Sequence, residues 1–302
     1  MEQQFEAEVT DGGERLDKYL ASIYTQQSRS FFQKLIKDEL VLVNGSLSKT
    51  SYRVEPGDTV SVTMPKAQEI AVLPEAIPLD ILYEDFDLLI VNKPKGMVVH
   101  PSAGHFSGTL VNAVLYHCKD SLSGINGEIR PGIVHRIDMD TTGALIVCKN
   151  DAAHICIAHQ IKEHTVTRRY RGIVLGRVKE DSGRIEGAIG RHPTERKKMA
   201  VNEKNGKPAV THYRVLQRFR QHTYLEFQLE TGRTHQIRVH MASMGHPLLG
   251  DALYGNGKNP FHLKGQTLHA MVIGFLHPSN QAYMEFTAPL PEYFQELLEK
   301  KL

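Results

Sequence analysis

Gly132-Ile133-Val134-His135-Arg136-Ile137-Asp138-Met139-Asp140-Thr141-Thr142-Gly143 is the most informative stretch of the chain. An apolar strand end runs into charged side chains and a Thr-Thr-Gly turn, and a second apolar strand follows at 144–148. Rigid strands hold such a loop in place, so it is well suited to carry a site. A guanidinium beside a carboxylate favours the ionised form, and an ionised carboxylate can act as a nucleophile or a base. On local features alone, a salt-bridged turn is the better interpretation.

A second polar stretch, residues 231–240, has the pattern of a strand end followed by a short helix. Gly232 ends the strand, and Thr234 is the predicted N-cap of the helix. Helical spacing places His235 and Arg238 at one edge, three residues apart. The apolar face of this helix is predicted to hold Ile237, Met241 and Met244. Taken alone, it is an ordinary amphipathic helix with a solvated polar edge.

Together these stretches resemble the RluA-type family of RNA pseudouridine synthases. Residues 135–138 followed by 141–143 are similar to the family's catalytic motif, with Ile137 where leucine is usual. Other motifs follow the family's order: 89–96, which open its catalytic domain, 167–170, with Arg168 where lysine is common, 232–240 and 245–255. The resemblance covers about residues 80–290.

The resemblance implies an isomerisation that detaches uracil from C1′ of its ribose and rejoins it through C5, which needs no cofactor. Asp138 is the implied catalytic carboxylate, either adding to the sugar or taking a proton from it. Arg238 is its implied ion-pair partner, and Tyr170 is implied to pack against the uracil and to handle the proton from C5. Arg136 is implied to hold the target nucleotide out of its stack. Within the same motifs, three residues are expected to contact RNA or support the loops: His135, Arg233 and His235.

Residues 12–65 are predicted to form a small domain of helices and a hairpin. Residues 28–30, 33–37 and 41–45 resemble the alpha-L, or S4-type, RNA-binding fold, first known from a small-subunit ribosomal protein. Residues 28–53 hold 5 basic and 2 acidic residues, so one face is positive inside an acidic segment. The residues predicted to bind RNA there are Arg29, Lys34 and Lys37.

The predicted fold class is α+β. Proline-punctuated residues 66–79 are expected to be a linker, and residues 80–295 a pseudouridine synthase domain around a mixed, mainly antiparallel sheet. The fold class of this domain is inferred from the many short β-type runs and few long helices after residue 80.

The net charge of +2 conceals an uneven distribution. Residues 161–220 hold 16 basic and 6 acidic residues, while the rest of the chain is mildly acidic. Clustered positive charge favours a polyanionic partner, although a solvated surface would also explain it. An exposed hairpin here is expected to contact phosphates through Arg196, Lys197 and Lys198.

Composition narrows the remaining possibilities. No apolar run reaches the roughly 18 residues of a membrane span, and the acidic start does not have the pattern of a secretory signal, so a cytoplasmic protein is expected. The chain has 16 histidines but no HExxH, and its 3 cysteines form no CxxC, so no metal site is expected.

Further expectations concern the RNA substrate and the oligomeric state. Large-subunit ribosomal RNA is the expected substrate, with transfer RNA as an open choice, and the chain is expected to act as a monomer. The alternative is a catalytically inactive RNA-binding protein acting in ribosome assembly, which predicts loss of Asp138 or Arg238. Both residues are present.

Overall fold

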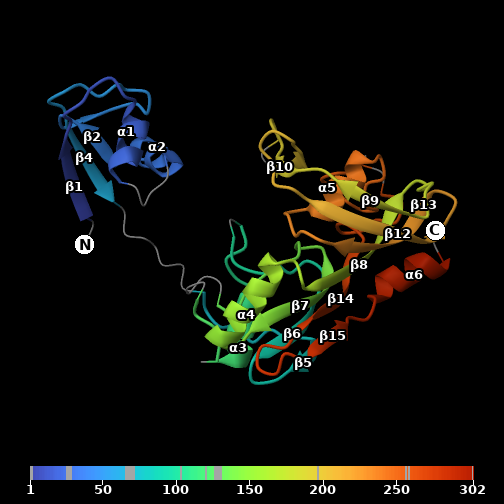
Figure 1. Ribbon diagram of the computed structural model, residues 1–302. Coiled ribbons are helices and arrows are strands. Elements are labelled where there is room, and N and C mark those ends of the chain that lie inside the picture. Colours follow the sequence, from blue (N-terminus) through green and yellow to red (C-terminus); the bar gives the residue numbers. More distant parts are fainter. Residues whose placement is uncertain are drawn as a thin grey trace. The chain divides into compact units, whose positions relative to one another are not determined.

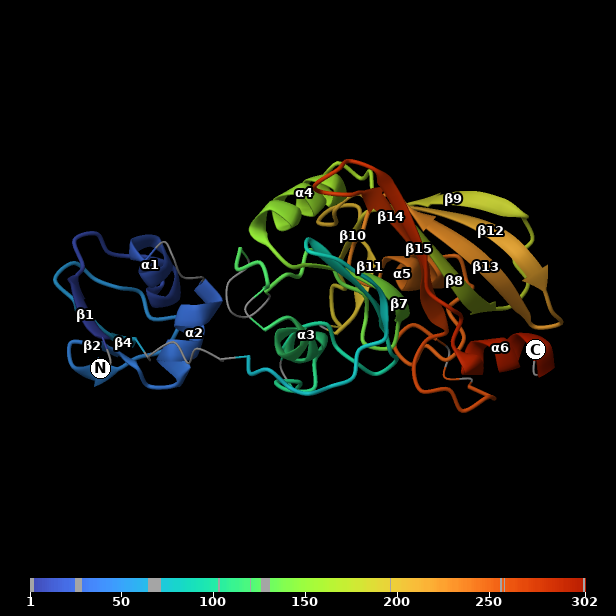
Figure 2. The ribbon, with the colours of Figure 1, turned by 90° about the horizontal axis from the view of Figure 1, so that it is seen from below.

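The computed structural model describes residues 3–24, 29–64, 72–102, 104–119, 121–125, 131–195, 197–255, 257, 259–300 and 302. The chain divides into two compact units, Met1–Ile70 and Ala71–Leu302. Residues 65–71, which include the start of the predicted linker, and Arg196 lie outside the described residues. Each unit has its own hydrophobic core. Figures 1 and 2 show the helices and strands of each unit.

The first unit packs two helices on a small antiparallel sheet. The sheet has the order β1-β4-β2-β3, and its first strand precedes the predicted start of the domain at residue 12. Its elements are β1 (Gln3–Glu8), α1 (Leu16–Ile23), α2 (Arg29–Lys37), β2 (Val41–Val43), β3 (Ser46–Leu47) and β4 (Thr59–Met64). Asn44 and Gly45 form the β2–β3 turn with φ of 50° and 74°, as their tolerance of positive φ predicts. Leu16, Leu20 and Phe32 are fully buried in the core.

A buried carboxylate joins the two helices of this unit. The side chain of Asp17 is 0% exposed and accepts hydrogen bonds from Arg15, Arg29 and Gln33 at 3.0, 3.1 and 2.6 Å. Burial by itself would raise the pKa of Asp17, but these hydrogen bonds outweigh it and hold the pKa well below its usual range.

Replacing Asp17 with Asn should therefore destabilise the first unit by about 2–3 kcal/mol at neutral pH. Because the folded-state pKa is depressed, this stabilisation is present above the unfolded pKa of about 3.9 and is lost as pH falls below it. Hydrogen exchange of peptides from α2, measured at pH 7 and pH 3, checks both points. An equal loss of protection in Asp17→Asn at the two pH values would contradict this account.

The second unit is built on a nine-stranded sheet. Its order is β5-β6-β7-β14-β8-β13-β12-β9, with β15 paired to β14, and every pairing is antiparallel except β7–β14. This confirms the predicted fold class. The strands are β5 (Ile81–Glu84), β6 (Leu88–Lys93), β7 (Thr142–Cys148), β8 (Thr167–Leu175), β9 (Ser182–Glu186), β12 (Val210–Arg218), β13 (His222–Leu229), β14 (Leu268–Leu276) and β15 (Tyr283–Thr287).

Alternating side chains of β6 explain how helices cover both faces of one half of the sheet. Leu89 and Val91 pack in the same core cluster as α3 (Leu110–Cys118), whereas Leu88 and Ile90 pack with α4 (Asp151–Lys162). In the other half, α6 (Glu292–Lys300) packs through Phe294 and Leu297, and α5 (Gln236–Ser243) through Ile237 and Met241.

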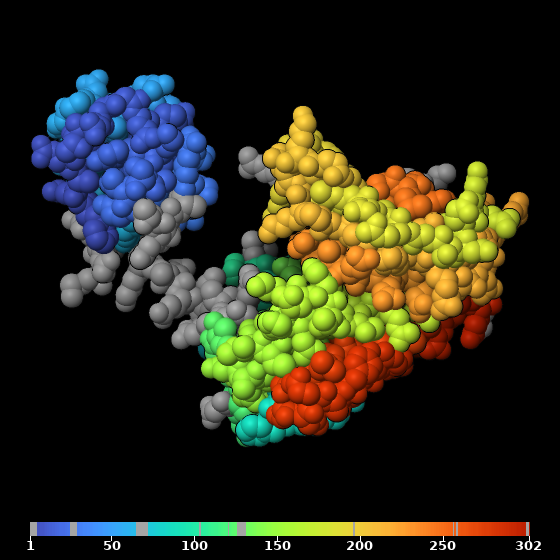
Figure 3. All heavy atoms as spheres, viewed as in Figure 1, coloured from blue at the N-terminus to red at the C-terminus, as the bar shows by residue number. Residues whose placement is uncertain are grey.

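A small hairpin, β10 (Ile189–Arg191) and β11 (Met199–Val201), is separate from the main sheet. Figure 3 shows it standing out from the surface of the second unit, in yellow. Its two ends are joined by residues 192–198, the position of the predicted phosphate-binding loop.

Candidate active site

Asp138 lies in the loop that leads directly into β7 in the middle of the sheet. At the start of β7, Gly143 has φ of 112°, and a Cβ there would lie 2.2 Å from the carbonyl oxygen of Ala270 on β14. Only glycine fits this close parallel approach, so the Thr-Thr-Gly turn fixes where the loop joins the sheet. The loop is also held by Lys93, which is fully buried. Its ammonium donates to three carbonyl oxygens at 2.7–2.9 Å: those of Pro94, Met97 and Met139.

The site centres on an arginine bound by two carboxylates. Arg238 Nη1 donates to Asp138 Oδ2 at 3.0 Å, and its Nε and Nη2 donate to the two oxygens of Asp251 at 2.7 and 3.0 Å. The Asp251 side chain is 0% exposed, that of Arg238 is 9% and that of Asp138 is 18%. Burial would lower the pKa of Arg238, but the two carboxylates reverse the effect and raise it. The guanidinium is therefore permanently charged and fixed in orientation, with one edge against Asp138.

Asp251 was not identified from the sequence as a site residue. It lies inside the 245–255 motif, but no local pattern in the sequence indicates that it binds Arg238. Its Oδ1 also accepts the backbone amides of Leu253 and Tyr254 at 3.0 and 3.1 Å. These contacts help to hold the carboxylate in position against Arg238.

His235, rather than the predicted Thr234, is the N-cap residue of α5. It adopts a left-handed conformation with φ of 57° and makes no side-chain capping bond, because its ring points to the site instead. Its Nε2 is 3.8 Å from Asp138 Oδ1, and its Nδ1 is 2.8 Å from the Tyr254 hydroxyl, which accepts the Met199 amide of β11. The histidine thus connects Asp138, through Tyr254, with the loop end of the β10–β11 hairpin, where Met199 pairs with Arg191. Met244, predicted on the buried face of α5, is 40% exposed because the helix ends at Ser243.

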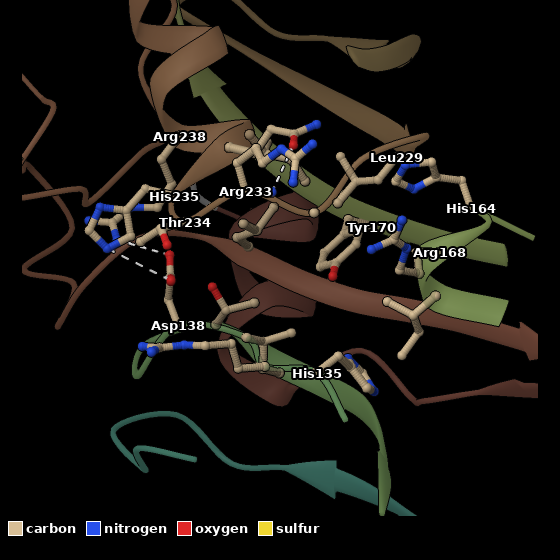
Figure 4. Close-up of a pocket in the computed structure, with 18 of the residues that line it drawn as sticks. His135, Asp138, His164, Arg168, Tyr170, Leu229, Arg233, Thr234, His235 and Arg238 are labelled. Carbon is tan, nitrogen blue, oxygen red and sulfur yellow. Dashed lines mark hydrogen bonds and ion pairs between the residues drawn. The ribbon is translucent and has the colours of Figure 1, made fainter. Parts of the chain in front are cut away.

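Tyr170 faces the same cavity from β8 and is 8% exposed (Figure 4). Burial raises its pKa, Arg168 opposes this and Asp138 adds to it, so the phenol remains protonated at neutral pH. A ring fixed in a strand beside a carboxylate offers a flat surface for a base.

The neighbouring residues His135 and Arg136 differ in environment: His135 is hydrogen-bonded to the backbone of β7, whereas Arg136 is exposed. His135 Nε2 accepts the Ile146 amide at 2.9 Å, and burial together with the charge of Arg168 lowers the pKa of His135 to about 3. It is therefore neutral and ties the loop to β7. Arg136 is exposed at the cavity mouth, and Arg233 is half-buried there, with Nε donating to the Pro208 carbonyl at 3.0 Å.

The predicted contacts outside the cavity differ in their freedom to bind phosphate. Lys34, Lys37 and Lys197 are exposed. Arg29 is ion-paired with Asp17 at 3.0 Å, and Lys198 with Glu195 at 2.8 Å.

Much of the positive charge of residues 161–220 is paired within the sheet. Arg171 and Arg214 both bind Glu226 of β13, at 2.8 and 2.9 Å, and Arg169 binds Glu285 of β15 at 2.6 Å. The sequence count therefore overstates the charge that this stretch presents to a partner.

The cavity between these elements has a volume of about 570 Å³, within the range of small-molecule and nucleotide sites. Its cationic lining comprises Arg136, Lys162, Arg168, Arg233 and Arg238, and Asp138 is the one acidic residue among the described lining residues. A second cavity of about 280 Å³ also borders on Asp138 and Arg136. Among the residues described, no cluster of three or more potential metal ligands occurs. Nor does any described helix have the length and apolarity to cross a membrane.

Comparison with known proteins identifies the class to which this arrangement belongs. A family model described as RNA pseudouridylate synthase matches residues 87–243, and an S4 domain model matches residues 14–60. The chain belongs to the RNA pseudouridine synthase family, isomerases that convert uridine to pseudouridine in RNA, and its first unit carries an S4-type RNA-binding domain.

Particular relatives cover nearly the whole chain. It is 54% identical to an uncharacterized RNA pseudouridine synthase of Bacillus subtilis, over 95% of this chain and 93% of the relative. It is 45% identical to ribosomal large subunit pseudouridine synthase D of Zymomonas mobilis, with the same two coverages. Among solved structures, human RNA pseudouridylate synthase domain containing 1 matches with a TM-score of 0.59 and 28% identity, over 71% of this chain and 84% of that one.

Proposed function

We propose that this chain isomerises specific uridines of large-subunit ribosomal RNA, acting as a monomer in the cytoplasm. The observation that carries the proposal is the Asp138–Arg238–Asp251 chain of ion pairs, placed beside Tyr170 in a cavity lined by cations. The choice of RNA rests on the relatives named ribosomal large subunit pseudouridine synthase D, which are 42–45% identical over at least 95% of this chain. Neither the site nor the comparisons favour a catalytically inactive protein.

The proposed reaction breaks the bond from N1 of uracil to C1′ and forms a bond from C5 to C1′; at the end the C5 proton leaves and N1 takes up a proton, so that the product is an isomer of the substrate. Asp138 acts at the sugar, as a nucleophile at C1′ or as a base. Arg238 keeps the carboxylate charged and aimed at the cavity. Tyr170 packs against the detached uracil, and Arg136 at the mouth keeps the target nucleotide out of its stack.

Mapping pseudouridine in ribosomal RNA from cells that lack this protein tests the proposal. At least one large-subunit uridine should be unmodified in those cells, regain modification with the wild-type chain and stay unmodified with Asp138→Asn. If every large-subunit position remains modified while a transfer RNA position is lost, the proposed substrate is wrong. If no uridine changes, the proposed activity is wrong.

The loop of the β10–β11 hairpin should contribute to RNA affinity through phosphate contacts. Replacing Arg196, Lys197 and Lys198 together with Gln should reduce the slope of log K against the logarithm of salt concentration by about 2. Each phosphate contact contributes about 0.7–0.9 to this slope, and Lys198 is partly neutralised by Glu195. Filter binding to ribosomal RNA between 50 and 300 mM salt measures the slope. The matched control replaces three exposed cationic residues with Gln: Arg177, Lys179 and Arg220. They lie near the C-terminal end of β8. An unchanged slope in the hairpin variant would count against these contacts.

A further inference from the structure

The cavity that holds Asp138 has a second polar end on the far side of Tyr170. Arg168 lies two residues before Tyr170 on β8, so the two side chains share one face of the sheet. Figure 4 shows both reaching into the cavity, with Arg168 on the side away from Asp138. The cavity lining also includes three further basic side chains, here called the rim residues: Lys162, His164 and Arg233. Figure 4 shows His164 beside Arg168.

Arg168 is buried with donors left over. It is 7% exposed, its Nη2 donates to the Glu230 carbonyl at 3.1 Å, and its buried Nε has no hydrogen-bond partner among the described residues. A Cβ on Gly232 would lie 2.5 Å from Arg168 Nη1, so glycine at this position leaves the room that the guanidinium occupies.

Among the described residues, no carboxylate forms an ion pair with the cationic side chains at this end of the cavity. Within the described part of the chain, neither Arg168 nor any of the three rim residues has a carboxylate within 4.0 Å. The carboxylate of Glu230, whose backbone carbonyl accepts from Arg168, is bound to His212 and Arg184, although it lies close enough to His164 for the two charges to interact. Burial lowers the pKa of Arg168, and the neighbouring charge of Arg233 lowers it further, although Tyr170 partly opposes both. A buried cation without an anion is unfavourable, so this end of the cavity is complete only with an anionic ligand.

We propose that this end of the cavity is a binding site for a backbone phosphate of the RNA, adjacent to the target nucleotide. Arg168 is the deep contact, and Lys162, His164 and Arg233 surround the phosphate at the rim. A uracil carbonyl could accept a hydrogen bond from Arg168 Nε. However, a carbonyl is neutral, so it would leave Arg168 and the basic rim residues without an anion. A phosphate offers several charged oxygens to the planar guanidinium fork and to the rim. A phosphate held by Arg168 fixes the path of the RNA strand beside Tyr170, which positions the target nucleotide in the cavity.

This inference rests on the proposed function, since it assumes that RNA fills the cavity. The test uses the full chain and a radiolabelled transcript of the complete large-subunit ribosomal RNA. Filter binding measures RNA affinity at several salt concentrations, and the rate of uridine conversion is measured at a single salt concentration. Arg168→Gln should flatten the salt slope by about 0.7–0.9 and slow conversion at limiting enzyme by at least about tenfold. Arg168→Lys, which keeps the charge, should retain the salt slope. Arg220→Gln, the same loss of charge at the other end of β8, should change neither quantity.

Two outcomes would overturn the phosphate site. If Arg168→Gln is folded and slow but keeps the wild-type salt slope, Arg168 contacts the base rather than a phosphate. If Arg168→Gln does not fold, the double variant Lys162→Gln, Arg233→Gln replaces it, and a wild-type slope in that variant overturns the proposal. Absence of conversion by the wild-type chain would instead contradict the proposed function, because the salt slopes report the phosphate contact without turnover.

Discussion

Asp138→Asn is expected to lower the single-turnover rate of pseudouridine formation by at least about 10³-fold. The amide is close in size to the carboxylate, so the loop should keep its shape, but an amide neither adds readily to C1′ nor takes a proton from the sugar. It also leaves Arg238 with Asp251 as its remaining carboxylate, which preserves two of the three hydrogen bonds described for the guanidinium.

The measurement is mass spectrometry of digested RNA after mixing excess protein with a ribosomal RNA transcript. RNA affinity of Asp138→Asn should stay within about threefold of wild type, because one charge facing the cavity is a small part of a polyelectrolyte interface. A folded variant that retains more than one tenth of the wild-type rate would sink the assignment of Asp138.

Asp251→Asn should produce the second-largest effect, although Asp251 lies behind Arg238 as seen from the cavity. The fully buried carboxylate binds Nε and Nη2 of Arg238, and replacing it leaves a buried guanidinium with half its ion pairing and an amide that cannot accept at both atoms. Loss of one partner of a buried pair typically costs about 3–5 kcal/mol of stability. The rate should also fall by roughly 10²-fold, since Arg238 is no longer fixed against Asp138.

Chemical denaturation and single-turnover rates together measure this prediction. Asp181→Asn is the matched control, because Asp181 binds Arg218 at 2.7 Å but is 88% exposed, and it should cost less than about 1 kcal/mol. Equal stability losses in the two variants would show that the buried position of Asp251 has no special importance. A stable Asp251→Asn with the wild-type rate would remove Asp251 from the site.

The sequence predicted the loop around Asp138 well because its signals are local. Apolar runs on either side of a polar turn indicate two strands, and the second is β7, which begins at Thr142 within that turn. The prediction of the first strand is wrong: the described residues just before the loop form no strand, and Ile133 makes only an isolated bridge to Val147 of β7. The contact between Asp138 and Arg238 joins residues 100 apart in the chain, and no spacing rule reaches that far. Only the resemblance to a family brought those residues together before the structure did.

Residues whose roles depend on long-range packing were missed. Lys93 ends an apolar strand, which in sequence suggests a solvent-exposed lysine, yet three carbonyl oxygens enclose its ammonium. Likewise, the arginines of β8 and β12 suggested a strongly cationic surface, and their partners Glu226 and Glu285 lie outside the basic stretch. Charge counted along a segment cannot include carboxylates that pair with it from neighbouring strands.

Release of tritium from RNA labelled at C5 of uracil tests the central claim most directly. Each turnover moves C1′ from N1 to C5, so the hydrogen at C5 must pass to solvent. With a large-subunit ribosomal RNA transcript, the wild-type chain should release tritium in step with pseudouridine formed, and Asp138→Asn should release none above the rate without protein. Release by Asp138→Asn at the wild-type rate, or none by the wild-type chain, would contradict this account.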